Sequence, residues 1–283
     1  MLTITTIAAM KDAVRAEKAA LRTIGFVPTM GCLHEGHLSL VRASKAATGT
    51  TIVSIFVNPT QFGPSEDFAR YPRDLERDSS LLRRERADIL FVPEAADMYP
   101  PGFRTFAEVD GLQDKLCGRT RPGHFRGVCT VVLKLFEIIR PDKAYFGQKD
   151  AQQALILRRM TADLDLGVDL DVRPIVREPD GLAMSSRNRY LGPDDRRAAV
   201  VLSRSLGQAA TAIRGGERRP EAVIGLLRGL IQREPAARID YVEIVDAGTL
   251  EAAPDAGPGR LIALAVYFGT TRLIDNLIVP AEG

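Results

Sequence analysis

The stretch that decides the fold is IGFVPTMGCLHEGH, residues 24–37, in which an apolar run leads directly into the start of a helix. Ile24 to Val27 predicts a buried strand that Pro28 ends, because proline cannot donate to a sheet. His34 to Ala47 has the apolar spacing of a helix. Ligands of open parallel sheets bind at the carboxyl ends of strands, so we expect a site at this junction.

The rest of the first half repeats this alternation of strand and helix. A β-α-β-α order predicts an α/β fold with a Rossmann-like parallel sheet and helices on both faces. The strands are expected at 24–27, 51–57, 89–92 and 144–146, and the helices at 34–47, 74–87, 125–139 and 150–161.

The pattern changes near residue 176, after which helices precede strands. The polar loop REPDGLAMSSRNRYL, residues 177–191, comes first. We expect helices at 194–214 and 220–233, followed by antiparallel strands at 239–245, 261–268 and 272–279. Residues 1–176 are therefore predicted to form the parallel-sheet domain, and residues 177–283 a smaller α+β domain.

Composition excludes several classes of protein. The 283 residues are 45% hydrophobic and 26% charged, and the net charge is +2, so neither disorder nor a broad nucleic-acid surface is indicated. The three cysteines, Cys32, Cys117 and Cys129, form no CxxC pair and predict free thiols. No apolar run approaches the ~20 residues of a membrane span, and the first residues do not resemble a signal peptide. We expect a cytoplasmic protein.

The two histidines at the junction predict contacts with phosphate. His34 and His37 are three residues apart, so both imidazoles lie on one face of the first helical turn, and Gly36 allows a nucleotide to approach closely. The helix start is also expected to offer unpaired backbone N–H groups and a partial positive charge. A zinc protease HExxH motif needs another histidine spacing, so no metal ligands are predicted here.

Polar side chains also follow the second strand. Asn58 and Gln61 can donate to and accept from hydroxyls and a carboxylate, and they lie at the same expected edge of the sheet as the histidines. A third segment, RPGHFRG at 121–127, is interpreted as a turn before a helix, although Arg121 could meet a carboxylate or phosphate.

Two later segments add charge that suits a triphosphate. Gly147 permits close approach, Lys149 is a point charge, and Gln153 lies four residues further on the same helical face. The loop MSSRN carries Ser185, Ser186 and Arg187, which could close over the site as a lid.

Together these segments resemble the pantothenate synthetase family, the pantoate–β-alanine ligases of the HxGH nucleotidyltransferase-like superfamily. The blocks that carry the resemblance are PTMGCLHEGH, IFVNPTQFGPSEDFARYPR, RPGHFRGV, FGQKDAQQ and REPDGLAMSSRNRYL, in that order along the chain. The resemblance implies a Rossmann-like domain, a C-terminal lid domain and a homodimer. It also implies ATP, pantoate and β-alanine as substrates, with Mg²⁺ held mainly by the phosphates of ATP.

The resemblance also implies roles for individual residues. His34, His37, Lys149 and Arg187 are implied as catalytic, and Asn58, Gln61 and Gln153 as contacts of pantoate and β-alanine. The implied ATP site comprises Pro28, Thr29, Met30, Gly31, Cys32, Leu33, His34, Glu35, Gly36, His37, Gly147, Gln148, Lys149, Asp150, Val176, Met184, Ser185, Ser186 and Arg187. Gln148 stands where many relatives have glutamate, and Cys32 is at a variable position.

The mechanism expected of this set has two steps. The pantoate carboxylate attacks the α-phosphorus of ATP and pyrophosphate leaves, after which the β-alanine amine attacks the activated carbonyl and AMP leaves. Two alternatives are a cytidylyl- or adenylyltransferase of the same superfamily and a nucleotide sensor without catalysis. Exchange of labelled pyrophosphate into ATP that depends on pantoate would separate all three.

Overall fold

The computed structural model describes residues 1–64 and 66–280, so Ser65 and the last three residues of the predicted second domain lie outside it. The chain divides into two compact units. Unit 1 comprises Met1–Asp114, Gly118–Gly147 and Ile156–Pro174, and unit 2 comprises Lys115–Cys117, Gln148–Leu155 and Ile175–Gly283. The domain boundary expected at residue 176 stays a prediction.

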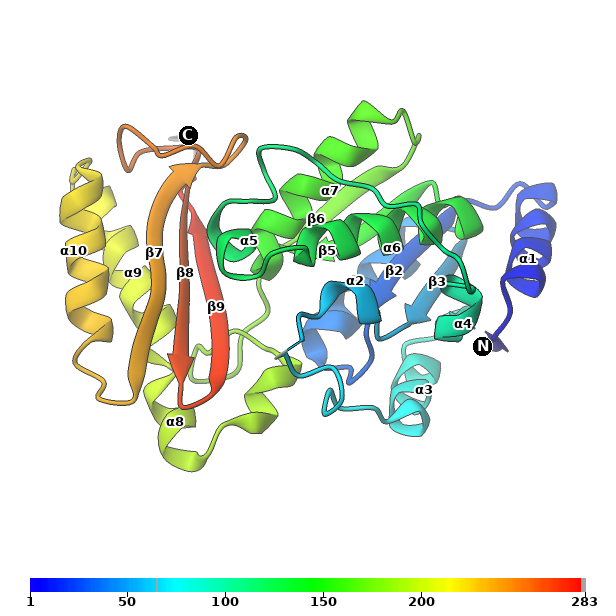
Figure 1. Cartoon of the computed structure of the whole chain (residues 1–283), viewed down its shortest axis with the longest axis horizontal. Helices are drawn as coiled ribbons and strands as arrows, with labels where there is room; N and C mark the ends of the chain where they lie inside the picture. Colours follow the sequence, from blue (N-terminus) through cyan, green and yellow to red (C-terminus); the bar gives the residue numbers. More distant parts are fainter. Residues whose placement is uncertain (65, 281–283) are drawn as a thin grey trace. The chain divides into compact units, whose positions relative to one another are not determined.

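Unit 1 is built on a parallel sheet, as the alternation predicts. Within the described residues the sheet has six strands in the order β1-β4-β3-β2-β5-β6, and every neighbouring pair is parallel (Figure 1). The strands are β1 (Leu2–Ile4), β2 (Ile24–Thr29), β3 (Thr50–Ile55), β4 (Ile89–Phe91), β5 (Lys143–Gly147) and β6 (Asp169–Arg173). Thr29 pairs with Ile55, so the loops that follow β2 and β3 leave the sheet side by side.

Helices cover both faces of this sheet, which confirms the predicted α/β class. On one face, α2 and α3 pack their Leu40 and Leu82 against Val27 of β2 and Val53 of β3. On the other face, Phe26 of β2 meets Phe136 of α6 edge to face at 6.3 Å. The helices are α1 (Ile7–Ala19), α2 (Glu35–Ala47), α3 (Leu75–Arg84), α4 (Ala95–Met98), α5 (Leu116–Thr120), α6 (His124–Ile139) and α7 (Ala151–Asp163).

A glycine allows α2 to approach β2 closely. A Cβ on Gly25 would lie 2.2 Å from Ser44 Oγ and 2.5 Å from Thr48 Oγ1, both on or beside α2. Only a residue without a side chain fits there. Because α2 lies against β2 at this point, the first turn of the helix is placed beyond the carboxyl end of the strand.

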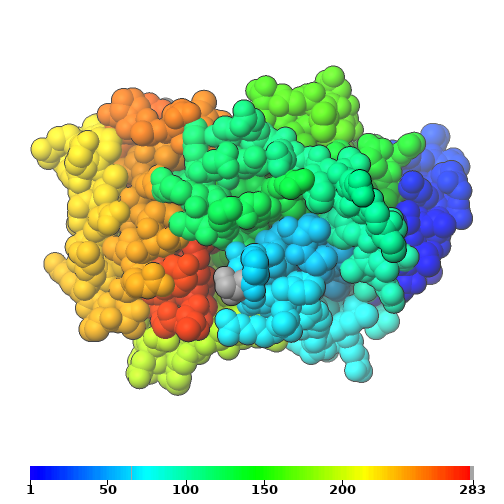
Figure 2. All heavy atoms as spheres, in the orientation of Figure 1, coloured from blue at the N-terminus to red at the C-terminus, as the bar shows by residue number. Residues whose placement is uncertain are grey.

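Unit 2 contains an antiparallel sheet of β7 (Ala237–Asp246), β8 (Arg260–Phe268) and β9 (Thr271–Ile278). Leu206 of α9 (Val201–Arg214) and Leu227 of α10 (Pro220–Ile231) pack with strand residues in one apolar core. In Figure 1 the two helices lie along this sheet, and β7 (orange) and α10 (yellow) reach the surface of unit 2 in Figure 2. This is the α+β arrangement that the sequence predicts.

The expectation of one helix over 194–214 is wrong. The structure has α8 (Pro193–Ala198) and α9, separated by Ala199 and Val200. At this point the hydrogen bonds shift from i−4 to i−3 acceptors: Val200 N donates to Arg197 O and Leu202 N to Ala199 O. Such a tightened turn ends one helix before the next begins.

Candidate active site

The loop after β2 is tightly held from both sides. Thr29 Oγ1 donates to Ser54 O at 2.7 Å and accepts from Gly31 N at 3.1 Å. Gly31 and Cys32 both have a positive φ, of 80° and 51°. Left-handed backbone is costly for a residue with a side chain, so the contacts around Cys32 must offset that strain.

The acceptor that stabilises this loop is Asp78 of α3, whose side chain is 1% exposed. Its Oδ2 accepts from Cys32 N at 2.7 Å and its Oδ1 from Leu33 N at 2.8 Å. Burial raises the pKa of Asp78, while hydrogen bonds from the two amides and the charge of Arg77 oppose that rise. The sequence analysis did not select Asp78, because nothing in the sequence connects α3 with a loop 45 residues earlier.

The two histidines form the N-terminal cap of α2. His34 Nδ1 accepts from Gly36 N at 3.2 Å, and His37 Nδ1 accepts from His34 N at 3.3 Å. The ring centroids are 4.1 Å apart. A ring nitrogen that accepts carries no proton, so these contacts select the tautomer of each neutral imidazole that has its proton on Nε2. Each ring can therefore present an N–H donor to an anionic ligand.

Backbone amides are less available to phosphate than the sequence analysis expected. The amides of Cys32 and Leu33 donate to Asp78, and those of His34, Gly36 and His37 donate to acceptors within the cap itself. The expectation of a helix start with unpaired N–H groups is therefore corrected for these five positions. The imidazoles are the stronger candidates for contacts with phosphate. Glu35 is turned to Arg42, with which it forms an ion pair along α2.

The loop after β3 is organised by Asn58, which is 1% exposed. Its Nδ2 donates to Gln61 Oε1 at 3.0 Å and to Gly127 O at 3.1 Å. Its Oδ1 accepts from Tyr99 Oη at 2.8 Å and from Thr60 Oγ1 at 3.0 Å. Because these contacts use both ends of the amide, the geometry favours Asn58 as the residue that orients Gln61. Tyr99, which the sequence analysis missed, supports it, and burial raises the pKa of that phenol.

Gln61 lies next to the first loop. The residue is 9% exposed, and its Nε2 lies 3.1 Å from Met30 Sδ. The structure thus brings together the two loops that the sequence analysis placed at one edge of the sheet. Gln61 belongs to a short 3₁₀ turn, η1 (Pro59–Gln61), which Asn58 caps.

The third segment is the turn before α6 that we expected, and its side chains contact the Gln61 loop. Arg121 is 17% exposed, and its guanidinium forms a two-pronged ion pair with Glu66, with Nε 2.8 Å from Oε1 and Nη2 2.5 Å from Oε2. His124 Nδ1 lies 2.9 Å from Gln61 O. A Cβ on Gly127 would lie 2.3 Å from Thr60 O, so α6 packs directly against η1. The segment therefore packs against the Gln61 loop, through partners that lie more than 50 residues away in the sequence.

Unit 2 carries the segment around Lys149. Asn276 Nδ2 donates to the carbonyls of Gln148 and Lys149 at 2.9 and 3.0 Å, and Gln148 Nε2 donates to Asn276 Oδ1 at 3.3 Å. The Lys149 side chain is 22% exposed, and its Nζ is 4.0 Å from Asp150 Oδ1. The 3₁₀ turn η2 (Gln148–Asp150) is therefore anchored to β9. Gln153, on the following helix, is half-buried.

The loop that carries Ser185, Ser186 and Arg187 is ordered by contacts within unit 2. Ser185 caps the 3₁₀ turn η3 (Ser186–Tyr190), its Oγ accepting from Arg187 N at 3.3 Å. Met184 N donates to Val176 O at 3.0 Å, which closes the loop on itself. Asn188 Nδ2 donates to Glu178 Oε1 and to Ala183 O.

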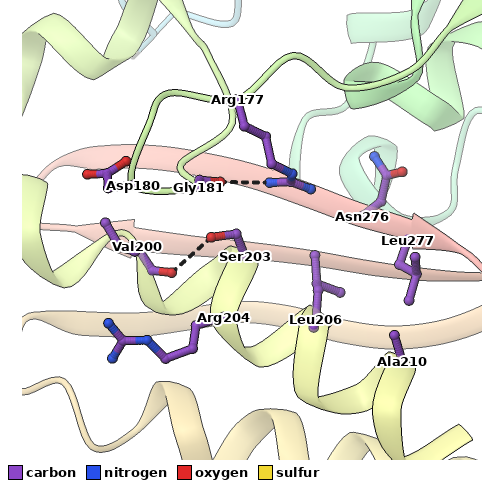
Figure 3. Close-up of a pocket in the computed structure, with 11 residues that line it drawn as sticks. Arg177, Asp180, Gly181, Val200, Ser203, Arg204, Leu206, Ala210, Asn276 and Leu277 are labelled. Atoms are coloured by element: carbon purple, nitrogen blue, oxygen red, sulfur yellow. Dashed lines mark hydrogen bonds between the residues drawn. The ribbon is translucent and has the colours of Figure 1, made fainter. Parts of the chain in front are cut away.

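A pocket of about 470 Å³ lies beside this loop, between α9 and β9 (Figure 3). Arg177 points into it and donates to Gly181 O at 3.1 Å, while the same guanidinium pairs with buried Asp275 at 2.6 and 3.0 Å. The pocket is also lined by Ser203, Arg204 and Leu206. The Arg177–Asp275 pair ties the start of the loop to β9.

The predicted residues therefore fall into two groups, one in each unit. Unit 1 holds those from Pro28 to His37, together with Asn58, Gln61 and Gly147. Unit 2 holds Gln148, Lys149, Asp150, Gln153, Val176, Met184, Ser185, Ser186 and Arg187.

Cys32, Cys117 and Cys129 form no disulfide, as predicted. Burial raises the pKa of the Cys129 thiol to about 12, which keeps it protonated and unreactive. Among residues 1–64 and 66–280, no group of three or more His, Cys, Asp or Glu side chains is arranged to hold a metal ion. In the same residues, no helix combines the length and apolar character needed to cross a membrane.

Comparison with known proteins identifies the family. Residues 2–278 match the model of the family described as pantoate-beta-alanine ligase. The chain belongs to the pantoate–β-alanine ligase family. It is 55% identical over 279 residues to a pantothenate synthetase of Pelotomaculum thermopropionicum, covering 99% of both chains. It is 58% identical over 268 residues to that of Roseiflexus castenholzii, covering 94% of this chain and 96% of the relative.

Solved structures agree with the sequence comparison. The crystal structure of a pantothenate synthetase from Thermus thermophilus matches with a TM-score of 0.95 and 44% identity, covering 99% of this chain and 100% of that one. A pantoate-beta-alanine ligase from Francisella tularensis, complexed with beta-gamma ATP and beta-alanine, matches with a TM-score of 0.82 and 34% identity over 98% of this chain and 97% of that one. The chain is thus a ligase that joins pantoate to β-alanine with ATP, as the resemblance implied.

Proposed function

We propose that ligation proceeds through a pantoyl adenylate, with residues of both groups contributing to the reaction. A pantoate carboxylate oxygen attacks the α-phosphorus of ATP, the bond to the bridging oxygen breaks, and pyrophosphate leaves. The neutral amine of β-alanine then attacks the acyl carbon, the bond from that carbon to the phosphate oxygen breaks, AMP leaves with the oxygen, and the nitrogen releases a proton to solvent. No protein nucleophile takes part. The observation that carries this assignment is the pair of imidazoles at the start of α2, each of which accepts from a backbone amide through Nδ1.

Charge neutralisation and positioning supply most of the catalysis in phosphoryl and nucleotidyl transfer. His34 and His37 donate to the phosphate oxygens on which negative charge develops. Lys149, Ser185, Ser186 and Arg187 add positive charge and hydroxyl donors from unit 2. Met30 and the rest of the β2 loop form the floor of the nucleotide site. No atom lies within 4 Å of the position that a Cβ on Gly147 would take, so a ligand can approach the backbone there.

Magnesium belongs to the proposal as a companion of the triphosphate. Mg²⁺ keeps several waters and is usually bound by substrate phosphates with one or two carboxylates. The half-exposed carboxylate of Asp150 beside Lys149 fits such a mixed set. When bound, the ion would neutralise charge on the departing pyrophosphate, while the residues of the chain orient the reacting groups.

The proposal extends to the assembly, the location and the second domain. We propose a cytoplasmic homodimer in which the segment from residue 177 onward acts as a lid that excludes water from the acyl adenylate. Sedimentation of the intact protein measures the dimer. Partial proteolysis with and without ATP and pantoate tests closure, because an ordered lid protects the Met184–Arg187 loop from cleavage.

Exchange of labelled pyrophosphate into ATP tests the proposed intermediate. The reaction requires ATP, Mg²⁺ and pantoate and proceeds without β-alanine, because the first step alone is reversible. Label that enters ATP only when pantoate is present supports the adenylate. Exchange that needs β-alanine as well, or no exchange beside normal formation of the ligated product, contradicts it.

Gln61→Ala is expected to weaken pantoate binding while sparing the nucleotide. Gln61 Nε2 lies at the junction of the two loops and offers a neutral donor for a hydroxyl or carboxylate of pantoate. In the variant that group of pantoate loses its donor, and a buried polar group without a partner costs roughly 1–3 kcal/mol. We expect the KM for pantoate to rise on the order of 10-fold or more, with affinity for an ATP analogue nearly unchanged in calorimetric titration. A large loss of nucleotide affinity would instead assign Gln61 to the ATP site.

A further inference from the structure

The contacts of Asp78 suggest a role beyond packing. Its carboxylate lies at the positive end of α2, and both of its oxygens are used by the amides of Cys32 and Leu33, two residues that are themselves buried. Buried amides without acceptors destabilise the fold. A single side chain therefore satisfies the two consecutive donors that immediately precede the cap residue His34.

We propose that Asp78 is a positioning residue for adenylate formation, which holds the Gly31–Leu33 loop so that His34 and His37 direct their Nε2–H groups at the phosphates. This proposal rests on the function proposed above.

The geometry of the loop gives the physical reason. Gly31 and Cys32 are both left-handed, and the Cβ that a side chain would add at Gly31 would stand 3.1 Å from Asp78 Oδ2. Without the carboxylate, the amides of Cys32 and Leu33 lose the acceptors that hold the strained loop in this conformation. Leu33 leads directly into His34, so a change in the loop rotates the residue whose amide donates to His37 Nδ1. Both imidazoles then lose the contact that selects their tautomer.

The charge of Asp78 also selects what binds phosphate. Consecutive amides in a loop before a helix make a common anion site. Here a carboxylate already occupies the amides of Cys32 and Leu33 and repels a second anion. The triphosphate is thereby directed to the imidazoles, which can follow charge as it develops. Arg77 completes the arrangement, because its Nη1 donates to Leu33 O at 3.0 Å.

The main test compares Asp78→Asn with Asp142→Asn. Asp142 is a matched control, since its Oδ2 accepts from Ile24 N at 2.6 Å at the opposite end of the same strand, β2. In Asp78→Asn one amide N–H faces an NH₂ group instead of an acceptor. We expect the rate of pantoate-dependent exchange at saturating ATP to fall on the order of 10-fold or more, because small misplacements of catalytic groups have effects of that size. Asp142→Asn should keep near-normal exchange.

A second readout follows the imidazoles without any substrate. The chain has three histidines, His34, His37 and His124, so ¹⁵N-labelled histidine gives three ring systems that single substitutions assign. In the wild type, His34 and His37 should show the pattern of the Nε2–H tautomer. In Asp78→Asn both should move towards tautomer averaging, while Asp142→Asn leaves them unchanged. This readout stands even if the wild type shows no exchange, which would overturn the proposed adenylate instead.

Arg77→Ala keeps the test decisive if Asp78→Asn does not fold. The Arg77 side chain is 41% exposed, so its removal disturbs the core little. The substitution takes one donor from Leu33 O and leaves the two amide donors of Asp78 in place. We expect a smaller loss of exchange and a smaller movement of the same two imidazoles. Unchanged histidine signals in a folded Asp78→Asn, or in Arg77→Ala if only that variant folds, would overturn the proposal. So would a loss of exchange that Asp142→Asn reproduces at equal loss of thermal stability.

Discussion

Replacement of His37 by alanine is expected to lower the rate of pantoate-dependent pyrophosphate exchange on the order of 100-fold or more. Loss of one preorganised donor at a developing charge typically has an effect of that size. The change removes the Nε2–H donor and also the Nδ1 that accepts from His34 N. Exchange at saturating ATP and pantoate, measured on folded protein, checks the prediction.

Two further substitutions separate the donor from the cap. His37→Gln places an N–H donor near the position of Nε2, whereas His37→Asn places an acceptor near the position of Nδ1. If the donor is what matters, the glutamine variant should retain more exchange than the asparagine variant. The reverse order would assign His37 a role in capping α2, and near-normal exchange in His37→Ala would remove it from the mechanism.

Residues 1–176 expressed alone should show almost no exchange. The fragment keeps the sheet, the histidine cap and the Gln61 loop, but it lacks Ser185, Ser186 and Arg187. It also lacks Asn276, which donates to the carbonyls of Gln148 and Lys149, so the lysine segment loses its anchor. Weak binding of nucleotide should persist through the imidazoles. Exchange and calorimetric titration with an ATP analogue measure the two effects.

The full-length variant Asn276→Ala is the companion experiment. It removes only the anchor of η2 and leaves the loop of Ser185 to Arg187 in the chain. We expect a loss of exchange that is clearly smaller than in the fragment, with a raised KM for ATP. Substantial exchange in the fragment would contradict the lid. The family resemblance also implies that the dimer contact lies on the N-terminal domain, and sedimentation of the fragment as a folded monomer would contradict that placement.

Apolar periodicity, together with the positions of proline and glycine, predicted helices and strands best where the apolar pattern was long. The helix expected at 125–139 is α6, and the strand expected at 261–268 is contained in β8. Short or polar elements were missed: β1 has three residues, and β6, with the sequence DLDVR, has no long apolar run to mark it. The first of these forms only because β4 pairs with it, and the second because β5 does.

The candidate site divides in the same way. Histidine, glycine, asparagine and glutamine residues that follow predicted strands can be selected as site candidates from the sequence alone, because the carboxyl ends of parallel strands lie at one edge of the sheet. Asp78, Tyr99 and the Arg121–Glu66 pair carry no such mark. Each makes its contact with a partner between 41 and 55 residues away, and that contact depends on how the helices pack.

The sequence by itself determined the α/β class and the junction at residues 24–37, because strand and helix periods and glycine positions are local properties of the chain. The family followed from the resemblance of five sequence blocks. The tertiary structure alone decided which groups at that junction can serve a substrate. Hydrogen-bond donors buried by folding must find acceptors, and the nearest acceptor is set by packing rather than by sequence distance. Asp78 takes the amides of Cys32 and Leu33, and the cap takes those of His34 and Gly36, so our proposal assigns the phosphates to the imidazoles.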